Sequence, residues 1–159
     1  MQKARIAKTK SALSLLFGSL AILVLVAILF ANRHKDCIGG YRKDATIMID
    51  SYAVISERAD TNEARQTGLS NRACIPEHTG MLFVFDKSDL HGIWMKDMNF
   101  VIDVLWLDST KKVVHLEKYM PPDSYPAVYY PKDPALYVLE LRSGSVDGEN
   151  ITVGQQLSW

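Results

Sequence analysis

The stretches Gly80-Met-Leu-Phe-Val-Phe85 and Phe100-Val-Ile-Asp-Val-Leu-Trp-Leu-Asp108 predict a β-rich protein with ionisable side chains inside its strands. Because side chains alternate along a strand, Asp103 shares a face with Leu105 and Leu107, and the opposite face is apolar as well. Such a strand is buried on both sides. A buried carboxylate needs a cation, a hydrogen-bond donor or a water-filled cleft, so Asp103 belongs either to a structural pair or to a site.

A second carboxylate, Glu140, lies in a similar apolar strand pattern, and Arg65 and Lys96 are the natural partners of the two acids. Two carboxylates beside a cation can act as a general acid and base when burial separates their pKa values. The same residues can also form a buried salt-bridge network, which is common in protein scaffolds. The indole of Trp94 can stack on a sugar or another planar ligand, or it can be part of the core.

The segments around these stretches predict short elements. Residues 46–55 form one strand, or two strands with a break at Asp50-Ser51. The segment Asp60-Thr-Asn-Glu63 has the pattern of a capping box with Asp60 as N-cap, and the helix that it starts ends near Gly68. After the polar connection 86–92, strands follow over 93–97 and 100–107.

The second half of the domain continues the sheet. A turn at 108–111 leads into a strand over 113–118, which gives a hairpin. Residues 119–134 hold five of the six prolines and form a loop, whose tyrosines either contact a ligand or cover the core. A strand over 135–141, a turn or short helix over 143–150 and a closing strand over 152–159 complete an α+β domain. It is mainly antiparallel β, either a sheet or a small partly closed barrel, with one short helix.

The N-terminal part predicts a membrane anchor. Four basic residues within positions 1–10 precede an uncharged stretch over 11–31, which is long enough to span a bilayer. The charge bias places residues 1–10 in the cytoplasm as a basic leader and the domain on the extracytoplasmic side, so the chain is a single-pass protein of the cell membrane. A cleaved signal peptide is the alternative, although its apolar region is normally shorter. A linker over 32–45 leads to the domain at 46–159.

Cys37 and Cys74 are the only cysteines, and a disulfide between them suits an oxidising compartment. Two unrelated free thiols are the alternative, because the sequence does not supply their separation. No metal site and no cofactor are predicted, since the histidines lack ligand spacing and no phosphate loop, nucleophile elbow or zinc-protease motif occurs. The balance of 18 basic and 18 acidic residues gives no footprint for nucleic acid.

Several of these motifs occur in an order and spacing that resembles the domain of unknown function 192 family, over about residues 46–159. The resemblance is carried by Glu63-Ala-Arg65, Gly68-Leu69, Gly80–Phe85, Trp94-Met95, Asp103, Asp108, Val138-Leu-Glu140, Gly144 and Gly154. It implies a small, β-rich prokaryotic domain that is often exported. It brings no established activity, catalytic residue or cofactor.

Three functions agree with these observations. The leading hypothesis is a non-catalytic binding or accessory module of the cell envelope, in which Arg65, Trp94, Lys96, Asp103 and Glu140 surround a polar pocket under the proline-rich loop and take a small molecule or a glycan. One alternative is a hydrolase of a cell-envelope polymer that uses two of these residues as a carboxylate pair, which requires the acids to lie about 5 to 9.5 Å apart. The other is a structural partner in a membrane complex, with an exposed apolar patch and no pocket.

Overall fold

The computed structural model describes residue 37 and residues 41–159. The chain divides into two units at residues 38 and 39, and the domain considered below is the second unit. Its elements in chain order are β1 (Ala45–Ile49), β2 (Tyr52–Ala59), α2 (Asn62–Thr67), β3 (Thr79–Asp89), β4 (Ile93–Trp94), β5 (Ile102–Leu107), β6 (Val113–Met120), the 3-10 helix η1 (Pro122–Ser124), β7 (Val128–Tyr129), β8 (Ala135–Arg142), α3 (Ser145–Gly148) and β9 (Leu157–Ser158).

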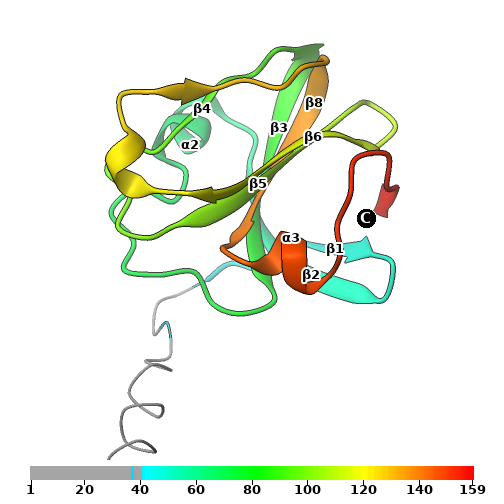
Figure 1. Cartoon of the computed structure of the whole chain (residues 1–159), viewed down its shortest axis with the longest axis horizontal. Helices are drawn as coiled ribbons and strands as arrows, with labels where there is room; N and C mark the ends of the chain where they lie inside the picture. Colours follow the sequence, from blue (N-terminus) through cyan, green and yellow to red (C-terminus); the bar gives the residue numbers. More distant parts are fainter. Residues whose placement is uncertain (1–36, 38–40) are drawn as a thin grey trace, which may run out of the picture. The chain divides into compact units, whose positions relative to one another are not determined.

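A curled seven-stranded sheet with the order β6-β5-β8-β3-β2-β1-β9 forms the body of the domain (Figure 1). β4 and β7 form a separate two-stranded ribbon. Neighbouring strands are antiparallel except β2 and β3, which run parallel from the pair Ile55 and Thr79 onward. A parallel pair needs a crossover connection, and α2 lies in that connection. The prediction of a mainly antiparallel, partly closed sheet is therefore confirmed, with one parallel pair added.

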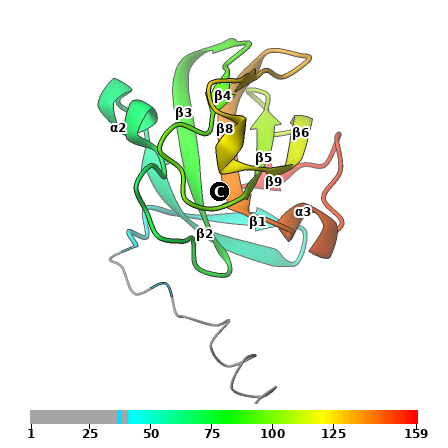
Figure 2. The ribbon, with the colours of Figure 1, turned by 60° about the vertical axis from the view of Figure 1, so that its left-hand side comes forward.

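Each face of the sheet carries its own hydrophobic core. On one face, Phe83, Val138 and Trp106 lie in register across β3, β8 and β5. On the other face, the next register row is Leu82, Leu139 and Leu105. Residues of the α2 region and of the β4–β7 ribbon pack on the first face, and residues of α3 and the C-terminal segment pack on the second (Figure 2). The central strands are consequently buried from both sides, as the sequence predicted.

Helix α2 begins one residue later than predicted. Its N-cap is Thr61, whose backbone is extended and whose Oγ1 accepts a hydrogen bond of 3.1 Å from the Ala64 N–H. Asp60 instead pairs with Arg58 at 3.5 Å. The predicted end is correct, because Gly68 is the C-cap with φ +48°, a conformation in which a Cβ would also lie 3.2 Å from the Phe83 ring.

Other predicted boundaries were right in kind and wrong in extent. The break at 50–51 and the β5–β6 hairpin are confirmed. β4 is shorter than the predicted 93–97, because Asp97 with φ +56° and a Met98 N–H bond to the Met95 carbonyl turn the chain. β9 is shorter than 152–159, because a turn at 152–155 precedes it.

Other elements are longer than predicted or additional to the prediction. β3 extends into the predicted polar connection, and the proline-rich loop contains η1 and β7. The described residues contain two short α-helices, α2 and α3, and α3 lies where a turn or a short helix was predicted.

The predicted anchor over 11–31 lies outside the described residues. Within the part of the chain that the structure does describe, no helix is long and apolar enough to cross a bilayer. Both Cys37 and Cys74 are disulfide-bonded, which agrees with the predicted bridge and not with free thiols.

Asp103 is fully buried and its partners are backbone groups, not the predicted Arg65 or Lys96. Its Oδ1 accepts from the Tyr119 N–H at 2.9 Å, at an irregularity in the β5–β6 register. Its Oδ2 accepts from the N–H groups of Gly144 and Val146 at 3.0 Å each. The carboxylate thereby caps α3, which lacks a capping side chain of its own, and holds it against the bulged strand β6.

We expect Asp103→Asn to lower the free energy of unfolding by about 3 kcal/mol, because an amide replaces a charged acceptor and turns an NH2 group towards backbone donors. Urea unfolding followed by tryptophan fluorescence measures this. Asp86→Asn is the matched control, since Asp86 is exposed on β3 and should stay within about 0.5 kcal/mol of the wild type. Equal stability of the two variants would contradict a structural role for Asp103.

Candidate functional site

A pocket of about 310 Å³ lies between α2, β3 and β4, on the face of the sheet that α2 covers. Its wall combines hydroxyl, amide and guanidinium groups with aromatic rings, and it is partly open to solvent. The lining residues are Asn62, Arg65, Gln66, Thr67, Gly68, Leu69, Ser70, Phe83, Phe85, Gly92, Ile93, Trp94, Met98 and Glu140. Three predicted site residues are therefore in one place: Arg65, Trp94 and Glu140.

Glu140 is the buried ionisable group of this pocket. Its residue surface is only 5 % exposed, and its Oε2 is buried without a hydrogen-bond partner among the described residues. Burial raises the pKa of the carboxyl group to about 8, although the positive charge of Arg72 acts in the opposite direction. At pH 7 the side chain is mostly a neutral acid, which can both donate and accept a hydrogen bond.

Arg65 is held at the rim of the pocket by its own hydrogen bonds. Its Nη1 donates to the carbonyl oxygens of Val84 at 2.6 Å and Asp60 at 2.9 Å, and its Nη2 donates to Asn62 Oδ1 at 2.6 Å. Its guanidinium lies 5.4 Å from the centre of the Phe85 ring. These contacts use three of the five N–H donors of the guanidinium and fix its position. The acceptors are two carbonyl oxygens and one amide oxygen, so Arg65 is not paired with a carboxylate in these bonds.

Trp94 stands at the boundary between this pocket and a neighbouring hollow. Its side chain is on the surface, with 45 % of the residue exposed, so it is not the core indole that was the alternative. Lys96 lines the neighbouring hollow together with Asp97 and Asn71, and not the pocket itself. Ser70 follows α2, and its Oγ donates a hydrogen bond of 2.8 Å to the carbonyl oxygen of Lys96. This bond joins two segments that line the neighbouring hollow.

The predicted carboxylate pair is not formed. Glu140 pairs in register with Val104 and shares its face, whereas Asp103 belongs to the opposite face, where it bonds α3. A hydrolytic pair has to flank one bond, and two acids on opposite faces of a sheet do not. The predicted roof is also wrong, because no residue of the proline-rich loop over 119–134 lines the pocket.

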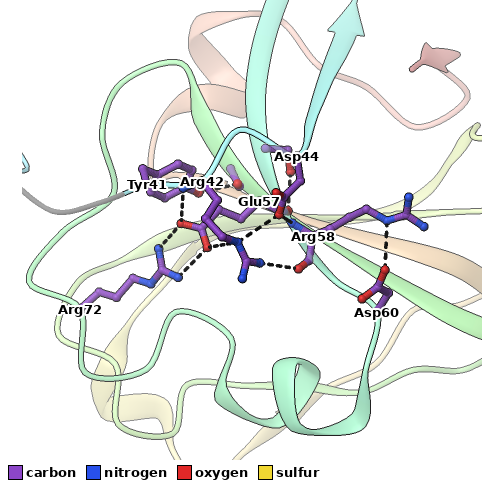
Figure 3. Close-up of polar contacts among 9 residues, drawn as sticks. Tyr41, Arg42, Asp44, Glu57, Arg58, Asp60 and Arg72 are labelled. Atoms are coloured by element: carbon purple, nitrogen blue, oxygen red, sulfur yellow. Dashed lines mark hydrogen bonds and ion pairs between the residues drawn. The ribbon is translucent and has the colours of Figure 1, made fainter.

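An ion pair that the sequence patterns did not predict lies on the same face of the sheet as Glu140. Glu57, only 3 % exposed, accepts from Arg72 Nη1 at 2.7 Å and Nη2 at 2.9 Å (Figure 3). The guanidinium lowers the pKa of Glu57, so this carboxylate stays ionised. Glu57 lies two residues before the buried Ala59 on β2 and therefore shares its face, and this period of two was a usable signal. The predicted strand ended at Ile55, so the prediction did not include Glu57 as a strand residue.

This ion pair and Glu140 belong to one row across the sheet. Glu57 is in register with Met81 on β3, and Met81 is in register with Glu140 on β8. The two acids are thus two strands apart, roughly 10 Å between Cα atoms. Tyr41, whose hydroxyl donates to the Gly80 carbonyl, and Arg72 both interact electrostatically with Glu140. The neutral acid Glu140 is therefore on the same face of the sheet as the Glu57–Arg72 ion pair.

The chemistry of the site is hydrogen bonding and aromatic contact. The residues that the structure describes contain no group of three or more potential metal ligands of the His, Cys, Asp or Glu type. A buried neutral carboxyl, a guanidinium fixed by hydrogen bonds and an exposed indole line one pocket, and this combination suits recognition of an uncharged polar ligand.

Comparisons with known proteins agree with this description of the fold. The sequence model of the DUF192 family, described as an uncharacterised ACR, matches residues 45–159. A UPF0127 protein of Pyrococcus furiosus is 35 % identical over 73 residues, which are 46 % of this chain and 57 % of that protein. This chain therefore matches little more than half of the length of that relative.

Two solved structures share the fold. A proposed transcription regulator of Sinorhizobium meliloti 1021 has a TM-score of 0.67 and 25 % identity, over 75 % of this chain and 97 % of that one. A protein of unknown function from Novosphingobium aromaticivorans has a TM-score of 0.66 and 22 % identity, over 76 % and 100 % of the two chains.

The raised pKa of Glu140 predicts an unusual dependence of stability on pH. The folded state holds this proton up to about pH 8, whereas an unfolded glutamic acid releases it near its ordinary value of 4.5. Folding therefore binds a proton between these values, and the contribution of Glu140 to stability is present below about pH 4.5 and is lost as the pH rises towards 8.

Glu140→Gln should remove this dependence. We expect the variant to be more stable than the wild type by a few kcal/mol at pH 9 and similar to it at pH 4, as measured by urea unfolding at both pH values. Glu149→Gln, at an exposed position after α3, is the control and should change neither value. A Glu140→Gln variant that is destabilised at pH 9 would contradict the proposed protonation.

Proposed function

Because this chain belongs to the DUF192 family, whose members are described as uncharacterised, we propose its function from its own geometry: it is a non-catalytic binding module for a small polar molecule or a glycan. The observation that carries the proposal is the buried Oε2 of Glu140, which has no hydrogen-bond partner in the described residues and belongs to a side chain that lines a pocket. An unsatisfied buried polar atom costs about 1 to 3 kcal/mol. Because the Glu140 side chain lines the pocket, a ligand that brings its carboxyl group into a hydrogen bond would recover part of that free energy.

The surroundings of Glu140 support binding more than catalysis. A second acid on the same face, Glu57, is occupied by a two-pronged ion pair with Arg72 and stands two strands away. The other buried acid, Asp103, supports α3 on the opposite face. With neither acid beside Glu140, we do not carry the hydrolase hypothesis further. The hypothesis of a structural partner in a membrane complex predicted that the domain has no pocket. The pocket beside Glu140 is therefore an argument against that hypothesis as a full account of the function.

We also propose that the module is held at the cell membrane with its domain on the extracytoplasmic side, as an accessory domain of the cell envelope. The uncharged stretch over 11–31 behind a basic leader supports this, and so do the disulfide-bonded cysteines, because such bonds persist in oxidising compartments. A binding site in that position meets molecules of the envelope.

A thermal-shift screen tests the binding function. The purified chain is scanned at pH 7 against sugars, amines, carboxylic acids and nucleosides. A ligand at one hundred times its Kd should stabilise the wild type by about 2.7 kcal/mol. Glu140→Gln and Trp94→Ala should lose most of this effect, because each removes a group of the pocket, whereas Glu149→Gln should keep it. Ligands that stabilise the Glu140→Gln variant as much as the wild type would place binding elsewhere.

Cell fractionation tests the location. The full chain, expressed in a bacterial host, should sediment with membranes, and protease added to spheroplasts should digest its domain. A chain that begins at residue 36 should be found in the soluble fraction, because it lacks the apolar stretch. Full-length protein in the soluble fraction, or a domain protected from external protease, would contradict the proposed anchoring or orientation.

A further inference from the structure

We propose that the ligand is an oligosaccharide, with one sugar unit in the pocket beside Glu140 and the next unit stacked on the exposed face of the β4–β7 ribbon. This inference rests on the proposed binding function and adds the ligand class and a second subsite. It is carried by the aromatic surface of the ribbon, which is continuous with the pocket at Trp94.

The ribbon has one buried and one exposed face. Ile93 pairs with Tyr129 and Trp94 pairs with Val128. Ile93 and Tyr129 belong to the hydrophobic core under the ribbon. On the other face, Trp94 is 45 % and Val128 is 38 % exposed. Trp94 is also part of the pocket wall, so the exposed face of the ribbon begins where the pocket ends.

Gly92 shows that a second aromatic ring, that of Tyr130, packs closely at the start of this ribbon. A Cβ at Gly92 would come within 2.6 Å of Val128 Cγ1 and within 2.7 Å of the Tyr130 ring, so only glycine allows this approach. The ring of Tyr130 therefore packs against Gly92, the residue before β4, yet 58 % of Tyr130 is exposed. Gly92 and Trp94 both line the pocket, so Tyr130 and Trp94 offer two exposed aromatic side chains next to it.

A sugar chain fits both parts of this surface. The C–H face of a pyranose ring packs on an aromatic ring, while its hydroxyl groups donate and accept hydrogen bonds in the plane of the sugar. The pocket offers the amides of Asn62 and Gln66, the hydroxyl of Thr67 and the carboxyl of Glu140 for those hydroxyls. A charged ligand fits less well, because Arg65 already bonds three protein oxygens and the acid at the base is mostly neutral at pH 7.

The size of the pocket explains why the ligand extends beyond it. About 310 Å³ is at the lower end of the range of roughly 300 to 1,000 Å³ for small-molecule sites. A chain of several sugar units therefore has to leave the pocket, and the side marked by Trp94 gives it a continuous aromatic surface. Affinity should then depend on chain length.

The test is a titration of the full chain in detergent micelles with defined oligosaccharides of one to four units, including the β-1,4-linked oligomers of glucose and of N-acetylglucosamine and their monosaccharides. We expect a tetrasaccharide to bind about tenfold more tightly than its monosaccharide, since a supported aromatic contact changes affinity by about this factor. Tyr130→Ala should lower the affinity for the tetrasaccharide to that for the monosaccharide, and the affinity for the monosaccharide should not change. Tyr130→Phe should restore binding, because it keeps the ring.

Tyr125→Ala is the matched control, because it removes a ring that is 45 % exposed in the same loop but outside the ribbon. Affinity that is independent of chain length, or unaffected by Tyr130→Ala, would overturn the ribbon subsite. If no sugar binds while another class of compound stabilises the wild type and not the Glu140→Gln variant, this inference fails and the proposed function stands. If no compound distinguishes these two proteins, both fail.

Discussion

Burial of the central strands on both faces is the constraint on which the rest of this structure depends. β3, β8 and β5 have a hydrophobic core on each side, so the side chains of their central sections, residues 81–83, 138–141 and 102–107, are buried whichever face they point to. Polar groups placed there have to be satisfied within the protein. Asp103 on β5, Glu140 on β8 and Glu57 on the neighbouring strand β2 meet this requirement in different ways. Asp103 accepts three backbone N–H groups, Glu57 binds a guanidinium in two places, and Glu140 keeps its proton.

These three solutions assign different roles to residues of one type. Asp103 connects β5 to α3 and to the bulged end of β6, and its hydrogen bonds leave it no part in binding. Glu57 and Arg72 form an ion pair on the same face of the sheet as Glu140. Only Glu140 retains an unsatisfied oxygen, and it is the one that lines a cavity. The distribution of hydrogen-bond partners, more than burial itself, separates the candidate site from the scaffold.

Local sequence patterns predicted the strands well, because alternating apolar residues and turn residues act over a few positions. They also indicated that Asp103 and Glu140 are buried, and they grouped Arg65 and Trp94 with Glu140, with which the two residues line one pocket. They could not predict the partners of Asp103, which are backbone groups 16 to 43 positions further along the chain. They placed Asp103 and Glu140 in one site, although the two side chains are on opposite faces of the sheet. A shift of one residue in register moves a side chain to the other face, and register depends on strand pairing and not on composition.

The pocket draws its parts from segments that are far apart in the chain. Its helical wall, α2, follows β2, its exposed indole belongs to β4, and its acid lies near the C-terminal end of β8. These parts meet only when β3 has paired with β2 on one side and with β8 on the other. The site cannot exist in a partly folded chain that lacks either pairing. Occupancy is therefore coupled to the integrity of the whole domain, and a bound molecule resists the separation of any central strand, however remote the first break is from the pocket.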